Sequence, residues 1–429
     1  MTLGIGRKIY KLVKKLFPIN RSITGRGNRK TLSDIKKIIK NLKIKEYKSG
    51  QKVFDWKIPS EWNVNEAYVK LENKKIINFK NNNLHLISYS TNVNKYVNKK
   101  ELLKHIHVHK KSSSAIPYKT SYYKKYWGFC ISKDQKKKIK GNKFHVKIDS
   151  NFKKNGSLTI GELYIRGKSP YEILLSANIC HPSLANNELS GPTILTYISK
   201  YLEAKKNNYS YRILFIPETI GSITYLSKNL ENLKKRIIAG FHLTCIGDKG
   251  NFSMIETKNA NSYSDKVAKE VIKKFRKSKI YKFTECGSDE RQYNYPGIDL
   301  PIVTLMRSRF GTFKEYHSSK DNLQFINPRS LEESYNFVKN IIRKIEKNYN
   351  YNYRLFAKTK CEPFLSKRNI FRSLAGNKLT HSEKILFNVL YYADGRRISD
   401  LKQVLKCNYD VLVKNIELLN KHKLIKKVN

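Results

Sequence analysis

Short apolar runs that alternate with helical patterns constrain the fold of this chain most strongly. Between residues 157 and 350, "YEILLSANI" and "YRILFIP" are apolar throughout, as in strands buried on both faces, and "IIAGFHLTCIG" and "DLPIVTLM" repeat the style. Helical periodicity is expected between these runs, over residues 193–202, 223–235 and 264–277. The alternation predicts an α/β fold, with a sheet that carries helices on both sides.

Helix-capping residues give two local predictions. Thr31 or Ser33 is expected to cap a helix in "TLSDIKKIIKNLK", and Ser190 is expected to cap the helix that follows "ANICHPSLANNEL". The first helix would bury apolar side chains that recur at helical spacing, namely Leu32, Ile35, Ile38, Ile39 and Leu42.

The style of the sequence changes along the chain and predicts three domains. Residues 1–50 and 150–350 form the α/β domain, and residues 51–149, with the runs "AYVKLE" and "LHLISYS", form an inserted β-rich domain. Residues 347–369 read as a linker. Residues 370–429 then begin with a capping box, Thr380 and Glu383, and continue with two short helices, a longer one and a basic tail. This order is typical of a winged helix-turn-helix.

The chain of 429 residues is strongly basic, with 86 Lys and Arg against 34 Asp and Glu, a net charge of +52. Such a charge indicates either a polyanionic partner or a compositional bias. We interpret it as bias, because the lysines are spread throughout and form no Arg-rich stripe. Six cysteines without a C-x-x-C pair fit a reducing cytosol. No apolar run approaches the roughly 20 residues of a transmembrane segment. We therefore expect a cytoplasmic protein.

Polar residues at three strand ends are candidate metal ligands. His181 follows the first apolar run and Glu218 follows the second. His317 follows the last run after a short intervening segment. Ligands of an α/β sheet gather where strands end and helices begin. Two histidines and a glutamate form a zinc ligand set that leaves one position open for water.

Several strings carry a resemblance to known proteins. "CHPSLANNELSG", "PETIGSITYL", "GSDERQYNYPGIDLP" and "EYHSSKDNL" are similar, in order, to motifs of the clan MH zinc aminopeptidases. Together with "LFPINRSITGRGNRKTL", "VFDWKIPSEWNVNEAYV" and "IPYKTSYYKKYWGFC", they resemble a bacterial family of aminopeptidase-like proteins that accompany polysaccharide-biosynthesis genes. The resemblance implies a zinc-aminopeptidase-like mixed sheet flanked by helices, an inserted β-rich domain and a C-terminal winged helix-turn-helix.

Departures from the two-zinc pattern favour one Zn²⁺ over two. Asn187 occupies the position of the aspartate that bridges both metals, and Thr244 occupies that of a second aspartate. An adjacent Glu-Glu pair is reduced to Glu218. The resemblance therefore implies one zinc ion bound by His181, Glu218 and His317, with Asn187 able to contribute its side-chain oxygen.

The remaining polar residues of these motifs are assigned roles by the same resemblance. Glu188 and Asp289 are the candidate general bases, although Asp289 could instead orient a ligand histidine. Glu290 and Arg291 are candidates for binding substrate charge, or they could pair with each other. His242 could replace the aspartate that is absent at Thr244.

Two functions follow from these observations. The first is a metal-dependent amide hydrolase that acts on a small peptide or an amino-sugar amide in polysaccharide biosynthesis. The second is a non-catalytic binding or regulatory module that works through its winged helix and basic surface. Nucleic acid is not the favoured partner, because the expected recognition helix around residues 410–420 carries Asp410 and Glu417 beside Lys414. The sequence leaves a homo-oligomer open.

Overall fold

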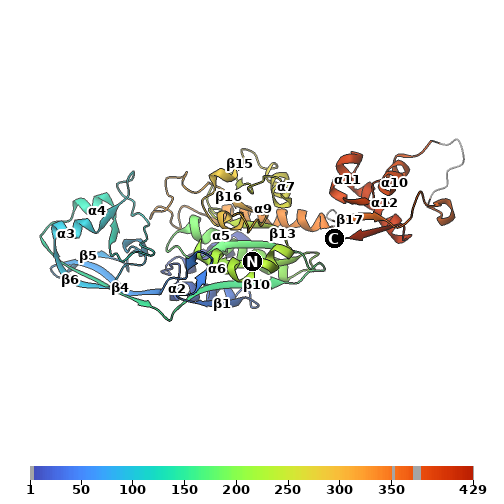
Figure 1. Cartoon of the computed structure of the whole chain (residues 1–429). Coiled ribbons are helices and arrows are strands. Elements are labelled where there is room, and N and C mark those ends of the chain that lie inside the picture. The colour runs from blue at the N-terminus through green and yellow to red at the C-terminus, as the bar shows by residue number, and fades with distance from the viewer. Residues whose placement is uncertain (1–3, 350–352, 371–377, 429) are drawn as a thin grey trace. The chain divides into compact units, whose positions relative to one another are not determined.

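The computed structural model describes residues 4–349, 353–370 and 378–428. These residues form two compact units that divide between Ile342 and Arg343. The first unit contains a large sheet and a smaller one, and the second is built of short helices and strands (Figure 1). In the described parts of the chain, no helix has the length and apolar character needed to cross a membrane.

The large sheet of the first unit has eight strands and is mixed, as predicted. Its four central neighbours, β12, β11, β13 and β16, are parallel, and they are the four apolar runs of the sequence. Antiparallel pairs flank them on both sides, β1 with β10 and β10 with β12 at one end and β14 with β16 at the other. In spatial order the strands are β1 (Lys43–Lys48), β10 (Ser157–Ile165), β12 (Ser210–Ile216), β11 (Glu172–Asn178), β13 (Ile237–Leu243), β16 (Ile302–Met306), β14 (Ser253–Ile255) and β15 (Lys279–Tyr281).

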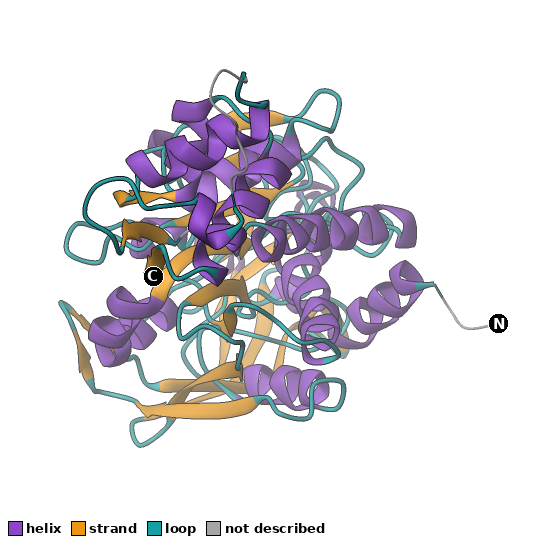
Figure 2. Cartoon of the chain, turned by 90° about the vertical axis from the view of Figure 1, so that its right-hand side faces the viewer, coloured by secondary structure: helices purple, strands orange, loops and turns teal. Residues whose placement is uncertain are grey.

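Helices pack on both faces of this sheet (Figures 1 and 2). Helix α6 shares a core with Leu174 and Leu214 on one face. Helix α5 lies on the other, where a Cβ on Gly191 would come within 2.3 Å of the carbonyl oxygen of Leu243. Only glycine fits this approach. The helices of the unit include α1 (Ile5–Leu16), α2 (Arg26–Lys36), α5 (Ser190–Glu203), α6 (Ile220–Arg236), α7 (Tyr263–Ile272), α8 (Glu290–Tyr293) and the first part of α9 (Pro328–Lys347), whose residues from Arg343 onward are assigned to the second unit.

The two helix starts expected from capping residues were wrong. Helix α2 begins at Arg26 after Gly25, whose φ of 103° places it in a conformation that favours glycine. Thr31 therefore lies inside the helix, and its hydroxyl donates to the carbonyl of Gly27. Ser190 is also internal, because a π-helical turn, η2 (Ala185–Leu189), precedes α5. Both helices thus start earlier than the serine and threonine positions suggest.

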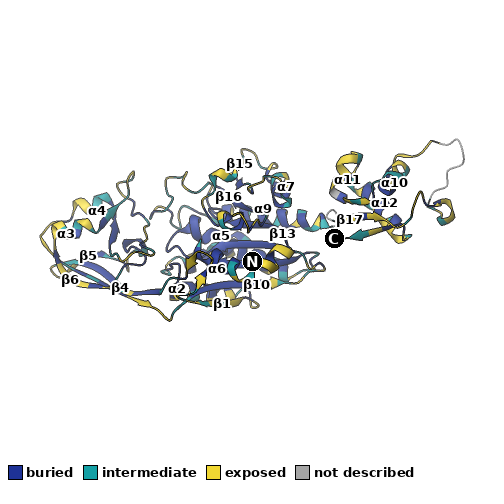
Figure 3. Cartoon of the chain, in the orientation of Figure 1, coloured by how far each residue is buried: buried dark blue, intermediate teal, exposed yellow. Residues whose placement is uncertain are grey.

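The inserted residues form a four-stranded antiparallel sheet. Burial alternates along β9, and Phe144, Val146 and Ile148 enter the core. In the first unit as a whole, buried residues are concentrated around α5 and β13 (Figure 3). The run "LHLISYS", expected to be a strand, instead begins with a 3-10 turn, η1 (Asn83–His85). The elements of this segment are β2 (Lys52–Val53), β3 (Trp56–Lys57), β4 (Glu61–Leu71), β5 (Lys74–Asn78), β6 (Val93–Asn98), α3 (Lys99–Lys104), β7 (Ile106–Val108), β8 (Phe129–Ile131), α4 (Lys133–Lys137) and β9 (Lys143–Lys153).

The second unit is the predicted winged helix-turn-helix. Thr380 and Glu383 form the expected capping box at the start of its first helix. The segment predicted as a linker contains a strand, β17, which pairs with both other strands of the unit. The wing sheet therefore begins before residue 370. In chain order the elements are β17 (Arg354–Ala357), η5 (Ser366–Arg368), α10 (His381–Tyr391), β18 (Asp394–Arg397), α11 (Ile398–Leu405), α12 (Tyr409–Lys421) and β19 (Ile425–Val428).

Candidate metal centre

His181 lies just beyond the end of β11 and is fixed by Glu188. The Nδ1 atom of His181 is 2.7 Å from Glu188 Oε2, and its backbone N–H donates to Glu188 Oε1 at 2.8 Å. Burial alone would lower the pKa of His181, but the charge and hydrogen bond of Glu188 raise it. With Nδ1 engaged, the free Nε2 atom lies 3.7 Å from Glu218 Oε2.

His317 places a second imidazole beside the first. The ring centroids of His181 and His317 are 5.2 Å apart, and Tyr316 stacks on His317 at 3.9 Å. Neither ring nitrogen of His317 has a hydrogen-bond partner among the described residues. Burial and the charge of His181 hold the pKa of His317 well below its ordinary value. A neutral imidazole with free nitrogens is a competent metal ligand.

Asn187 supplies a buried oxygen that has no partner. It lies in the π-helical turn η2, where its backbone N–H donates to Asp321 at 2.8 Å. Its amide nitrogen contacts Cys245 Sγ at 3.6 Å, whereas Oδ1 is buried without a hydrogen bond to any described residue. A buried acceptor left unsatisfied costs about 1–3 kcal/mol, so this oxygen is available to accept from a water or to bind a ligand.

Glu218 ends a chain of hydrogen bonds that starts on the neighbouring strands β11 and β13. Ser288 donates to Glu218 Oε1 at 2.7 Å, and Ser288 Oγ lies 3.2 Å from His242 Nε2. Ser176 contacts the other nitrogen of His242 at 2.9 Å. His242 is fully buried, and burial lowers its pKa to about 4. Both nitrogens of His242 are therefore used within the protein, and it does not replace the aspartate absent at Thr244.

Asp289 holds the turn that carries Glu218. Its Oδ1 atom accepts from the backbone N–H of Thr219 at 2.7 Å and from Ser222 Oγ at 2.9 Å. Thr219 has a φ of 64°, which a β-branched residue rarely adopts, so the turn depends on such anchors. Burial, with the nearby charge of Glu218, raises the pKa of Asp289 to about 8. Asp289 is fully buried behind Glu218.

Glu290 and Arg291 do not pair with each other. Glu290 is fully buried and accepts from the N–H groups of Gly287 and Ser288 and from the hydroxyl of Thr304, so it organises its own loop. The exposed Arg291 donates from Nε to the carbonyl of Ser288 at 2.9 Å. Glu290 is therefore engaged within the fold, whereas Arg291 is exposed.

Two buried charges that support the site were not singled out from the sequence. Arg21 donates from Nε to the carbonyl of His181 at 3.1 Å, and burial lowers its pKa to about 10. Asp321 accepts from the backbone N–H of Asn186 at 2.6 Å as well as from that of Asn187. Burial raises the pKa of Asp321 to about 7. Both residues lie inside strings that carried the family resemblance, which was the available signal.

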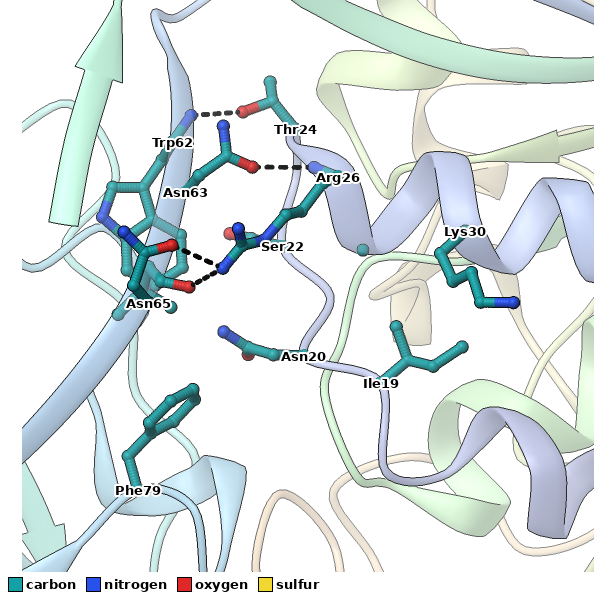
Figure 4. A pocket seen from close by; sticks show the side chains of 12 residues that line it. Ile19, Asn20, Ser22, Thr24, Arg26, Lys30, Trp62, Asn63, Asn65 and Phe79 are labelled. Atoms are coloured by element: carbon teal, nitrogen blue, oxygen red, sulfur yellow. Dashed lines mark hydrogen bonds between the residues drawn. The ribbon is translucent and has the colours of Figure 1, made fainter. Parts of the chain in front are cut away.

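The loop that carries Arg21 is tied to strand β4 (Figure 4). The backbone N–H of Trp62 donates to Thr24 Oγ1 at 3.0 Å, and the backbone N–H of Arg26 donates to Asn63 Oδ1 at 2.8 Å. The guanidinium of Arg26 also binds Asn65 Oδ1 at 2.8 Å. These groups line a cavity of about 400 Å³, but most of their polar atoms are satisfied by one another. The hydrogen bonds around this cavity therefore anchor the loop to β4.

Aromatic residues of the inserted segment cover the histidines. The ring of Tyr118 lies 4.7 Å from that of His181 and 5.2 Å from that of His317, and its hydroxyl contacts Tyr122 at 3.0 Å. The backbone N–H of Tyr118 donates to the carbonyl of His317. A cavity of about 250 Å³ remains beside the site, lined by Ile23, Trp56, Tyr122, Tyr123, Cys180, His181, Glu218, Thr219 and Ile220.

Nε2 of His181 and Oε2 of Glu218 form a donor pair that differs from the tighter cluster of Cys180, His181 and Glu188, which includes neither Glu218 nor His317. That cluster brings its ligand atoms within 4.8 Å of one another, but Glu188 already occupies Nδ1 of His181. Burial also raises the pKa of the Cys180 thiol well above its ordinary value, which disfavours the thiolate that binds metal. Nε2 of His181 and Oε2 of Glu218, 3.7 Å apart, can both reach one ion at the about 2.0–2.2 Å typical of zinc.

The fold belongs to the class of the zinc aminopeptidases. BSAP, a zinc aminopeptidase from Bacillus subtilis, matches 80% of this chain over 96% of its own, with a TM-score of 0.57 and 13% identity. An aminopeptidase from Aneurinibacillus sp. strain AM-1 matches 80% of this chain over 93% of its own, with a TM-score of 0.51 and 14% identity. At these identities the likeness concerns the fold alone.

The particular family is defined by closer matches. Residues 10–348 match a family described as a domain of unknown function (DUF4910), and residues 354–427 match a winged helix-turn-helix. The chain belongs to the DUF4910 family.

A curated protein and a solved structure, both from Clostridium acetobutylicum, match this chain over most of their length. One is provisionally named a polysaccharide biosynthesis protein with an aminopeptidase-like domain; it is 45% identical over 395 residues, 91% of this chain and 89% of the relative. The other is a crystal structure provisionally named a peptidase, 41% identical, covering 99% of this chain and 96% of that chain with a TM-score of 0.81.

Proposed function

We propose that this protein is a zinc-dependent amide hydrolase of the aminopeptidase type. The observation that carries the proposal is the orientation of His181, whose Nδ1 is held by Glu188 so that Nε2 faces Glu218 across 3.7 Å. His317 and the orphan oxygen of Asn187 provide further donors. His181, His317 and Glu218 would hold one ion, with Asn187 as an additional oxygen ligand. A bound zinc ion lowers the pKa of its water to about 7 and polarises a carbonyl.

The other residues of the site act on these ligands. Glu188 and Asp289, predicted as general bases, are both buried and engaged, and neither lines the cavity. We therefore assign them as positioning residues, Glu188 for the imidazole of His181 and Asp289 for the turn of Glu218. Tyr118 and Tyr122 would exclude water from the ligands.

The substrate class follows from a relative. A peptide amide fits the aminopeptidase-like fold, and an amino-sugar amide fits the polysaccharide-biosynthesis name of the C. acetobutylicum relative. We propose a small amide of one of these two kinds, because the cavity of about 250 Å³ at His181 is too small to admit a folded chain.

Metal content decides this proposal. Protein purified without a metal-affinity tag should contain about one zinc ion per chain by mass spectrometry, and His317→Ala should lose it. His105→Ala is the matched control, because His105 binds the carbonyl of Trp127 in the inserted segment and should keep the zinc. Absence of zinc from the wild type, even after reconstitution, would remove the basis of the enzyme assignment.

A second variant separates two roles for Glu218. Glu218→Gln should lose zinc, because an uncharged amide is a poorer ligand than a carboxylate. Retention of zinc with loss of amide hydrolysis would instead make Glu218 the proton acceptor. Peptide anilides and N-acylated amino sugars are suitable substrates for both measurements.

The winged helix-turn-helix gives little support to the alternative of a non-catalytic binding protein. On α12 the exposed Lys414 and Lys421 are accompanied by the exposed carboxylates of Asp410 and Glu417. A phosphate-binding face would present mainly Lys and Arg. We therefore place the principal function at the metal site.

A further inference from the structure

A larger cavity lies beside the one that contains His181. Its volume is about 680 Å³, within the range of small-molecule sites. Three segments line it: the hairpin of β2 and β3, one side of α6, and the stretch from α8 onward. The lining residues are Phe54, Asp55, Trp56, Ile223, Leu226, Leu230, Arg291, Gln292, Tyr295, Pro296, Gly297 and Ile298.

Three large aromatic side chains that line this cavity are exposed to solvent instead of being packed in the core. Phe54 is 46% exposed, Trp56 is 41% exposed and Tyr295 is 64% exposed. They come from two segments some 240 residues apart in the chain and converge on the same cavity. Gathered apolar surface of this kind, rimmed by polar residues, marks a binding site in soluble proteins.

The two cavities are neighbours. Trp56 lines both of them, and its ring contacts that of Tyr123, a wall of the smaller cavity, at 5.7 Å. Helix α6 also joins them, because Ile220 lines the smaller cavity and Ile223, one turn later, lines the larger. A ligand group that extends from Glu218 past Trp56 would enter the apolar cavity.

Arg291 provides a positive charge in the lining of the larger cavity. Its Nε is bound to the carbonyl of Ser288, next to Asp289 in the chain, and it has no ion pair with any described residue. It is also close enough to Glu218 to act on that carboxylate electrostatically. The charge is thus available for an anionic group of a ligand.

We propose that the apolar cavity binds a large aromatic or aliphatic group of the same substrate whose amide lies at His181 and Glu218, and that Arg291 binds a carboxylate of that substrate. The inference rests on the proposed function for the identity of the amide site. It narrows the substrate to a small acidic amide that carries one large apolar group, and it assigns Trp56 and Tyr295 to substrate selection.

Binding of 4-phenylbutyrate to the full-length, metal-free protein tests the cavity without any metal. Calorimetry should show saturable binding of one molecule per chain. Tyr295→Ser and Trp56→Ser should each weaken it at least fivefold, because each removes aromatic surface from the ligand. Tyr96→Ser is the matched control: Tyr96 is 65% exposed, lies on β6 and should leave the affinity unchanged. Absence of saturable binding, or an equal loss in the control, would overturn the inference.

Two hydroxamates then test whether the cavity and the metal site act together. In the zinc-loaded protein, phenylalanine hydroxamate should bind at least tenfold more tightly than glycine hydroxamate, and Tyr295→Ser should bring the ratio close to one. Equal binding of both by the wild type would show that the cavity is separate from the metal site and would overturn the proposal. If neither hydroxamate binds, the proposed zinc site fails, and the phenylbutyrate titration decides the cavity by itself.

Discussion

One hydrogen bond decides which nitrogen of His181 is free. Glu188 accepts from Nδ1 and from the backbone N–H groups of Cys180 and His181, and it is buried. The same bonds lower the pKa of Glu188 against the effect of burial. A carboxylate that accepts three hydrogen bonds and faces the buried Arg21 is suited to positioning His181 rather than to accepting a proton during the reaction. The arrangement fixes the imidazole before any ligand arrives.

Glu188→Gln is expected to weaken zinc binding by about 10–100-fold, because it keeps the shape of the side chain but removes the charge that orients His181. Competition with a chelator at pH 7 measures this. Glu231→Gln, an exposed position on α6, is the control and should leave the affinity unchanged. Unchanged zinc affinity in Glu188→Gln would show that the charge of Glu188 is not needed to orient His181 for the metal.

The pH dependence of zinc binding follows from the same contact. Zinc binds neutral imidazole, and the pKa of His181 is raised by Glu188. Protons therefore compete with zinc over a range that extends above the ordinary histidine pKa, and zinc affinity should fall as the pH is lowered through the raised value. Zinc titrations between pH 5 and 8 test this. In Glu188→Gln the fall should begin at a lower pH, and a midpoint that does not move would contradict the assignment.

Some residues of the site could be predicted from local sequence patterns, whereas others reach the site only through long-range contacts. His181, Glu218 and His317 follow apolar runs, so strand ends alone bring them together as candidates. Arg21 and Tyr118 reach the site through contacts with His181 that span 160 and 63 positions of the chain. No local pattern encodes such contacts, and only a resemblance over the whole string could have pointed to them.

At the scale of the elements, Asp34 on α2 interacts with three lysines, one of which belongs to α1. Its carboxylate is buried, accepts from Lys30 at 2.9 Å and forms ion pairs with Lys15 of α1 at 2.9 Å and with Lys37 at 3.2 Å. Burial by itself would raise the pKa of Asp34, but the lysines lower it to about 2. A carboxyl group whose folded pKa lies below its unfolded value stabilises the fold above pH 3.8, and this contribution disappears as the pH falls towards 2.

Asp34→Asn should lower the free energy of unfolding at pH 7 by about 1–2 kcal/mol, less than the full pKa shift implies because the lysines are solvent-exposed. Urea denaturation at pH 7 and at pH 3 measures the effect, and the difference from wild type should be clearly smaller at pH 3. Asp55→Asn, at an exposed position of the β2–β3 hairpin, is the control. A loss of equal size at both pH values would show that packing, rather than charge, is responsible.

Element types were more predictable than element ends. The four apolar runs became β11, β12, β13 and β16 because burial on both faces demands continuous apolar sequence. The start of α2 was missed because Gly25 begins the helix through its left-handed backbone rather than through a side-chain cap. The strand β17 was missed because its partners lie some 40 and 70 residues further along the chain.

At the scale of the whole molecule, the two units have separate cores. The core of the second unit is formed entirely by residues between Leu355 and Ile425, including Leu386, Leu412 and Ile416. The cavity residues and all candidate ligands lie between residues 23 and 317, within the first unit. Metal chemistry and winged-helix recognition are therefore expected to be separable by truncation.

A chain that ends at Tyr349 should keep about one zinc ion and the amide hydrolysis of the full-length protein, because α9 remains complete and its buried Ile341, Ile342 and Ile345 stay in place. Residues 353–429 alone should show helical circular dichroism and a cooperative thermal transition, since their apolar residues form a closed core. Zinc content and activity of the first fragment, normalised to its folded fraction, are the deciding measurements. Loss of zinc from a folded first fragment would contradict the separation of the two functions.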